Sequence, residues 1–168
     1  QYRIHQAARF KLEQSYDIDE ARADDLPAGT DKEPFSPLRA ELDIWLNSFF
    51  YFDSDAAWDV YEHRLQSGNF ALTATDERED RLYLGYRFTR DQTKSFLAEL
   101  LFNINRSFAA GFEYERNFQT DERLKVAGSL RYRSQCWGVK VRYLKEPSDR
   151  KIEFTINLVG LGEAGGSF

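Results

Sequence analysis

The sequence predicts an all-β fold, an antiparallel transmembrane β-barrel segment of about ten strands. Apolar and polar residues alternate with a period of two along most of the 168 residues, which is the periodicity of β-strands. Acidic residues recur on the polar face, and aromatic residues gather near strand ends. These features are typical of a barrel with a lipid-facing outside and a wet inside.

The first strand, within residues 2–16, places Phe10 and Leu12 on one face and charged residues on the other. An acidic stretch with Pro and Gly follows from Asp17 to Ser36, where we expect a long exposed loop. Pro37 begins the next strand. The remaining strands are predicted over 38–44, 50–58, 70–74, 82–88, 96–104, 108–114, 124–133, 137–143 and 152–158.

The connections between these strands alternate in character. We expect a very short one at Leu46–Ser48, a loop around Tyr61–Gly68 and a charged turn at Asp76–Asp80. Long loops outside and short turns inside are typical of outer-membrane barrels. Counting from the long acidic loop places the turn with Cys136, and both ends of the chain, on the periplasmic side. A flexible periplasmic tail is expected at the final glycines, Gly160, Gly162, Gly165 and Gly166.

A row of aspartates favours a lumen over a dry core. Asp53, Asp55 and Asp59 share one face of a strand, which is costly in a dry interior and easy beside water. The alternative, a soluble barrel or sandwich, would enclose Phe112 and Phe154 instead. Trp45 is an exception among the aromatic residues, because its parity faces inward. The aromatic residues expected at outer strand ends are Tyr16, Trp58, Phe88, Tyr114 and Tyr143, and those at inner ends are Phe108, Tyr132 and Trp137.

The composition excludes several classes. Hydrophobic residues make up 42% and charged residues 30% of the chain, and the mean hydropathy of -0.63 reads as soluble only because every second strand residue is polar. No run of about 18 apolar residues exists, which excludes a spanning helix. The net charge of -5 and the scattered Lys and Arg argue against nucleic acid.

Few residues are candidates for chemistry. Cys136 is the one cysteine, so it has either a partner outside the chain or a free thiol. His5 and His63 show no metal spacing, and we expect no metal and no cofactor. A barrel protease would need an acid and a histidine at its rim, and His63 near Asp59 and Glu62 is the candidate. Acidic loops commonly contain such a pair, so we expect no catalytic residues and no enzyme.

Four segments carry a family resemblance: Leu12–Asp17, Phe35–Arg39, Ser134–Trp137 and Ile152–Gly162. They resemble the C-terminal barrel region of the lipopolysaccharide-assembly family LptD, the organic solvent tolerance proteins, and the similarity covers essentially the whole chain. The resemblance implies that residues 1–168 are the C-terminal portion of an outer-membrane β-barrel domain, with no separate second domain. It also implies a role in inserting lipopolysaccharide (LPS) into the outer leaflet of the Gram-negative cell outer membrane.

The resemblance also implies partners and sites. The expected partners are LPS, an LptE-like lipoprotein plug, outer-membrane lipids, and a periplasmic LptA-like bridge reached through an N-terminal domain that is missing here. Cys136 would form a disulfide to that missing periplasmic domain, and Gln135 stands where the family often has an adjacent cysteine. The family's last strand closes the barrel against its first, and this seam is the lateral gate. The gate strand would contain Ile152, Phe154, Ile156 and Leu158.

The inward charges leave alternatives open. They could contact a plug protein or the sugar and phosphate groups of the lipid, or they could be solvated lumen residues that pair across strands. A second functional class, a complete ten-strand barrel enzyme or adhesin, would pair the strand near Phe10 with the strand near Ile156. The inward charges are Asp53, Asp55, Asp59, Arg87, Glu99, Glu113, Glu115, Lys125, Arg131, Lys140 and Arg142.

Overall fold

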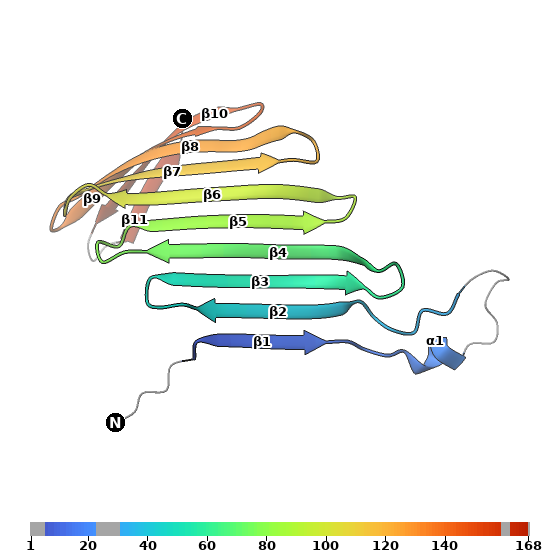
Figure 1. The fold of residues 1–168 in the computed structure, drawn as a ribbon. Helices are drawn as coiled ribbons and strands as arrows, with labels where there is room; N and C mark the ends of the chain where they lie inside the picture. Colours follow the sequence, from blue (N-terminus) through green and yellow to red (C-terminus); the bar gives the residue numbers. More distant parts are fainter. Residues whose placement is uncertain (1–5, 23–30, 159–161, 168) are drawn as a thin grey trace, which may run out of the picture.

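A computed structural model describes residues 6–22, 31–158 and 162–167, with only the backbone described for the last range. The chain forms one antiparallel sheet of eleven strands in sequence order, each paired with its neighbours along the chain (Figure 1). The strands are β1 Ala8–Glu13, β2 Leu38–Trp45, β3 Phe50–Asp59, β4 Arg64–Thr75, β5 Arg81–Thr89, β6 Thr93–Asn103, β7 Phe108–Asn117, β8 Glu122–Arg133, β9 Trp137–Lys145, β10 Arg150–Leu158 and β11 Gly162–Ser167.

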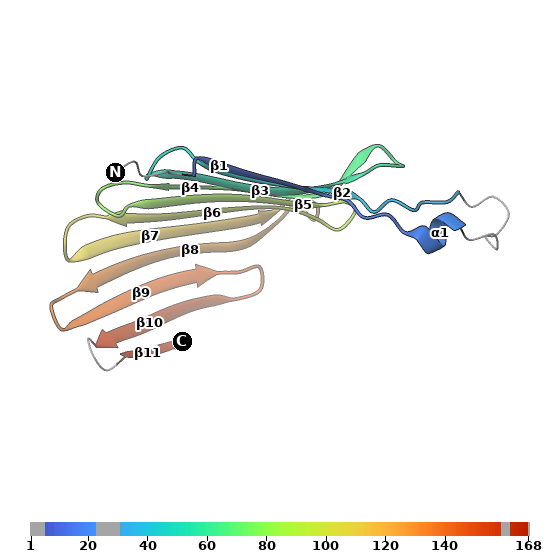
Figure 2. The ribbon, with the colours of Figure 1, turned by 90° about the horizontal axis from the view of Figure 1, so that it is seen from below.

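The sheet is curved and open. Viewed edge-on, β1 to β5 lie in one layer and β7 to β11 bend away from it (Figure 2). The two outermost strands are β1 and β11. A complete ten-strand barrel would pair Phe10 with the region of Ile156, but Phe10 pairs with Leu42, and Ile156 pairs with Val139 and Ala164. The predicted all-β, antiparallel barrel segment is confirmed, and the closed ten-strand alternative is not supported.

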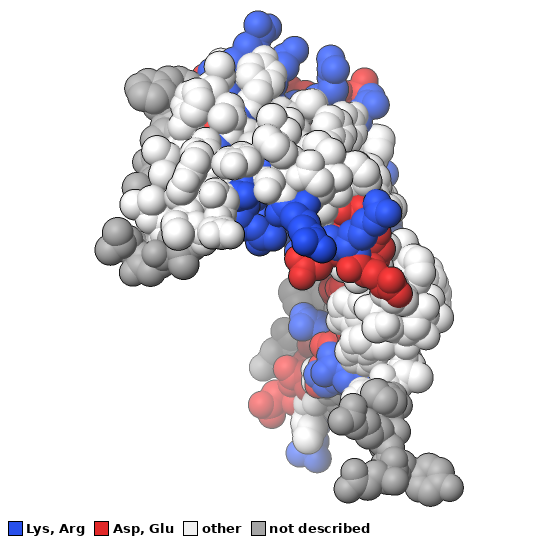
Figure 3. All heavy atoms as spheres, turned by 90° about the vertical axis from the view of Figure 1, so that its left-hand side faces the viewer, with Lys and Arg blue, Asp and Glu red and all other residues white. Residues whose placement is uncertain are grey.

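The two faces of the sheet differ in chemistry. The large apolar side chains are open to the surroundings, with exposed fractions of 47% for Phe112, 51% for Leu130 and 43% for Phe154. Charged side chains of both signs gather in the inner angle of the bent sheet, while uncharged residues cover much of the face toward the viewer and further Lys and Arg side chains lie along its upper margin (Figure 3). A soluble barrel would enclose these three apolar residues, so that alternative is wrong.

The tightest packing lies on the concave face, where side chains converge. The buried hydrophobic residues of the described chain are small there: Ala57, Ala71, Ala109 and Ala127, with Leu144 as the largest. Alanine suits a curved inner wall because larger side chains from neighbouring strands would collide. No helix within the described ranges has the length and apolar character needed to cross a membrane.

The C-terminal glycines do not form a tail as far as they are described. Gly162, Gly165 and Gly166 belong to β11, which pairs with β10 over six residues, while Gly160 lies outside the described residues. The prediction of a flexible tail is therefore wrong for these three glycines. The pairing depends on backbone hydrogen bonds, which need no alternating apolar side chains, so the periodicity gave no sign of it.

Two predicted loops also differ. Strand β4 begins at Arg64, so the expected loop over Tyr61–Gly68 shrinks to residues 60–63, and a bulge between Ala57 and Trp58 absorbs the change of register. The long loop contains a short helix, α1 Ile18–Arg22. Asp17 caps this helix, because its Oδ1 accepts the backbone N–H groups of Asp19 and Glu20.

The expected contrast between long and short connections rests on one loop. At the end of the sheet that carries α1, the later connections span only residues 60–63, 90–92, 118–121 and 146–149. At the opposite end, they span 46–49, 76–80, 104–107 and 134–136. The connection between β1 and β2 alone is long among the described ones, so the predicted alternation of loop length is wrong beyond it.

Candidate functional site: the concave face

An ion-pair ladder crosses four strands on the concave face. Glu113 of β7 accepts from Lys125 of β8 at 2.6 Å and from Arg142 of β9 at 2.7 Å, and Arg142 also donates to Glu153 of β10 at 2.9 Å. The side chains are 18 to 31% exposed. Because these side chains are partly shielded from water, their charge-assisted hydrogen bonds are stronger than ion pairs on an exposed surface. These four residues are called the ladder below, and it links strands β7 to β10 across the curved C-terminal part of the sheet.

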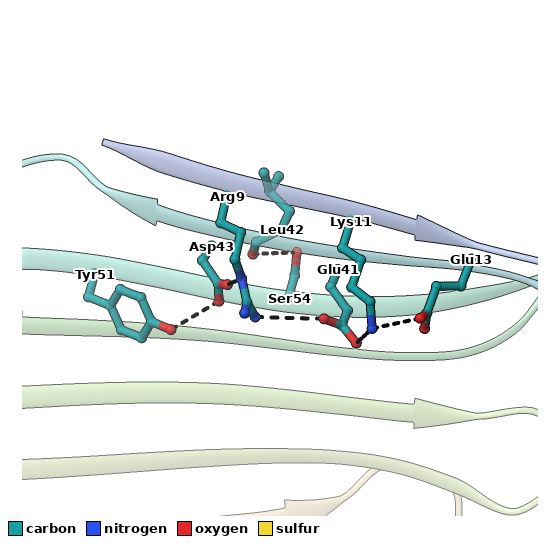
Figure 4. A network of polar contacts seen from close by, with 8 residues as sticks. All are labelled: Arg9, Lys11, Glu13, Glu41, Leu42, Asp43, Tyr51 and Ser54. Carbon is teal, nitrogen blue, oxygen red and sulfur yellow. Dashed lines mark hydrogen bonds and ion pairs between the residues drawn. The ribbon is translucent and has the colours of Figure 1, made fainter. Parts of the chain in front are cut away.

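A second polar cluster holds the first edge of the sheet (Figure 4). Arg9 of β1 donates to Asp43 of β2 at 2.6 Å, and the hydroxyl of Tyr51 donates to the other oxygen of Asp43 at 3.0 Å. Lys11 lies between Glu13 at 2.8 Å and Glu41 at 3.6 Å. Arg9 and Lys11 are about half exposed, so each ion pair contributes little alone. The cluster fixes the register of β1 on β2.

The position of Trp45 confirms the prediction that this aromatic side chain faces inward. It stacks on Tyr51 with ring centroids 5.3 Å apart, and Tyr51 in turn bonds to Asp43 on the concave face. Trp45 therefore lies on the polar side, as its position in the strand predicted.

The other predicted inward charges have different surroundings. Asp55 accepts from the Asn69 amide at 2.9 and 3.1 Å, and Asp59 accepts the backbone N–H groups of Tyr61 and Glu62 at 3.0 Å each. Among the residues that the structure describes, no ion pair within 4.0 Å involves Asp53, Arg87, Glu99, Glu115, Arg131 or Lys140.

The acid and histidine candidate has a structural explanation. Asp59 caps the turn between β3 and β4, and Glu62 pairs with Arg64 and, at 3.8 Å, with Arg90. His63 has a positive φ of 51° within the same turn. Both carboxylates therefore serve the turn instead of the imidazole. His5 lies outside the described residues, and within those residues no group of three potential ligands could hold a metal.

Cys136 lies at one end of the sheet, in the turn between β8 and β9. Its side chain is exposed and free, and the turn is closed by the Ser134 N–H, which donates to the Trp137 carbonyl at 2.8 Å. Three rings form a cluster beside this turn: Tyr132 lies 4.9 Å from Phe108 and 5.3 Å from Trp137 between ring centroids. These are the aromatic residues predicted at the inner strand ends, and the structure brings them together.

The predicted gate residues lie on the convex face of β10. Ile152, Phe154, Ile156 and Leu158 are 43 to 49% exposed. The expectation that their strand is the last one is wrong, because β11 pairs along its outer edge. The described C-terminal edge of the sheet is therefore β11, and the four residues lie one strand inside it.

Sequence reasoning missed one feature of this face, a hollow beside the Cys136 turn. Arg131, Arg133 and Lys140 border it, but only two of these positions stood out as inward charges. The missing signal was Gly138, whose lack of a side chain leaves the space between strands open.

Comparison with known proteins identifies a family. The LptD family model, described as LPS transport system D, matches residues 3–99, which is more than half of the chain and ends in β6. A search of curated proteins finds no match. The motif around Cys136 and the strand from Ile152 lie beyond the matched stretch.

Proposed function

The chain belongs to the LptD family of LPS transport, and we propose that its sheet is the C-terminal wall of an outer-membrane barrel that guides LPS into the outer leaflet. The proposal covers LPS transport and assembly without catalysis, with energy supplied elsewhere. LPS and the surrounding outer-membrane lipids are the ligands. An LptE-like lipoprotein plug would fill the lumen, and an LptA-like bridge would deliver LPS through a periplasmic domain outside this chain.

One observation carries the proposal: the sheet separates apolar and charged side chains onto opposite faces. Phe112 and Leu130 are exposed on one face, while the ladder around Glu113 and Arg142 occupies the other. In a barrel wall, the first face meets acyl chains and the second meets water. Sugars could then pass along the charged face while acyl chains stay in the bilayer.

The proposed lateral gate lies at the C-terminal edge. Ile152, Phe154, Ile156 and Leu158 would line its membrane side. Strand β11, which lies between them and the closing seam of the barrel, would part from β10 when the gate opens. The composition of β11 supports a weak pairing with β10, because three of its six residues are glycine, and glycine weakens a strand. A strand that separates easily allows a lipid to leave sideways.

The proposed orientation places the Cys136 turn and the start of β1 in the periplasm. The expectation that the C-terminal end also lies there is wrong for the described residues, because β11 runs from the Cys136 end back toward the end that carries α1. An exposed thiol at a sheet end can reach a second domain, and we propose that Cys136 forms a disulfide with the periplasmic domain. Such a bond would hold the delivery domain against the barrel entrance.

The test uses neighbouring residues that lie on opposite faces of β6. A photoreactive amino acid replaces Glu99 or Leu100 in the full-length protein in cells; Glu99 has no ion pair among the described residues, and Leu100 is 45% exposed. We expect LPS crosslinks carrying the sugar chain at Glu99, and phospholipid crosslinks at Leu100. Absence of LPS at position 99 during active transport would overturn the proposal.

A further inference from the structure

A hollow of about 670 Å³ opens on the concave face where β8, β9 and β10 end beside the Cys136 turn. Three cationic side chains border it: Arg131 and Arg133 from β8 and Lys140 from β9. Thr155 and Asn157 of β10 border the opposite side. The hollow thus combines three positive charges with two neutral polar side chains.

Within the described part of the chain, the three cations have no counter-ion at ion-pair distance. Among the residues that the structure describes, none of them makes an ion pair within 4.0 Å, although Lys125 and Arg142 on the same two strands are both paired. Arg131 and Lys140 are direct partners in the strand register, and like charges in that position destabilise a sheet. A bound anion would relieve this repulsion.

Gly138 keeps the hollow open. It pairs with Arg133 in the register, and a Cβ at this position would lie 3.1 Å from the Tyr132 carbonyl oxygen. A side chain there would press on this carbonyl, which would have to move by a few tenths of an ångström. Gly138 also lines the hollow and adds no side chain to it, which leaves its space to a group such as a phosphate.

We propose that this hollow binds a phosphate ester on the sugar of the transported lipid. The inference deepens the proposed function and rests on it. A guanidinium presents paired donors that match two phosphate oxygens, and an ammonium adds a mobile point charge. Thr155 and Asn157 can donate to the remaining oxygens. The hollow would hold the lipid headgroup at one end of the wall.

The experiment measures lipid binding to the full-length protein with its partner subunits in detergent. The probes are bisphosphorylated lipid A disaccharide, its dephosphorylated form and inorganic phosphate. Arg131→Gln, Arg133→Gln and Lys140→Gln are combined in one variant. We expect its affinity for the phosphorylated probe to fall by about tenfold or more, where tenfold corresponds to about 1.4 kcal/mol. Affinity for the dephosphorylated probe should not change.

Matched variants separate this site from general charge. Arg87→Gln removes an exposed cation on the same face, in β5 and outside the hollow, and we expect it to leave binding unchanged, in contrast to Arg131→Gln. Lys140→Arg should preserve binding. A heat-dependent shift of the folded band on a gel shows whether each variant folds, and the single variants give the answer if the triple one does not fold.

Three results would overturn the inference: equal binding of the phosphorylated probe by the triple variant, inorganic phosphate binding as tightly as the lipid probe, or release of the plug subunit without loss of lipid binding. The last result would assign the hollow to an acidic protein surface. The crosslinking at Glu99 is independent of these cations. LPS crosslinks there with unchanged probe binding would refute the inference alone, and absent crosslinks would refute the proposed function.

Discussion

At the scale of single residues, Glu113 is the most consequential side chain of the concave face. It accepts hydrogen bonds from Lys125 and Arg142, which lie on different strands, and its side chain is 23% exposed. Without its negative charge, these two cations would face each other, with Glu153 as the remaining partner of Arg142. Removing one partner of a partly buried ionic network leaves the other charges poorly satisfied.

We therefore expect Glu113→Gln to lower the free energy of unfolding by about 1–3 kcal/mol. Glu99→Gln is the control, because Glu99 lies opposite Glu113 in the register and has no ion pair within the described chain. Its effect should stay within about 0.5 kcal/mol and in the stabilising direction, because it removes a like charge opposite Glu113. The measurement is urea unfolding of the full-length protein in detergent. Equal midpoints for the two variants would show that the ladder contributes nothing.

At the scale of strands, periodicity in the sequence located ten of the eleven strands, because successive side chains in each of them alternate between an apolar face and a polar face. Strand β11 escaped this reasoning, since Gly162, Gly165 and Gly166 give no alternation. The ladder escaped it too. Glu113 and Arg142 are 29 positions apart, and only the three-strand register brings them together. A sequence shows which face a charge occupies, but not its partner.

The strand scale also gives a test of the proposed gate. Ile156 and Ala164 are register partners on β10 and β11, and Tyr143 and Ile152 are partners on β9 and β10. Paired cysteines at 156 and 164 should lock β11 and stop LPS from reaching the cell surface under oxidising conditions. The control pair at 143 and 152 should leave transport unchanged, because the pairing of β9 with β10 is longer and lies inside the wall. Reduction should restore transport.

Surface LPS is measured by its accessibility to an added modifying enzyme, with the disulfide confirmed on a gel. Normal transport with a fully formed bond between positions 156 and 164 would rule out separation of β11 from β10. An equal block by the control pair would mean that any added crosslink disables the barrel.

At the scale of the whole molecule, the open sheet cannot be a finished barrel wall. The described edge strands β1 and β11 each pair on one side only, and unpaired backbone groups are costly within a membrane. In the proposed barrel, further strands would therefore cover both edges. The segment also carries its one cysteine at a sheet end, exposed and without a partner within the described chain.

We expect Cys136→Ser to change the migration of the full-length protein on a non-reducing gel, because loss of a disulfide between distant segments opens a long covalent loop and makes the denatured chain less compact. Reducing agent should remove the difference. Ser134→Ala in the same turn is the control and should migrate like the unaltered protein, since it leaves the thiol intact. If Cys136→Ser and the unaltered protein migrate together without reductant, Cys136 is a free thiol and the barrel is joined to its delivery domain by other contacts.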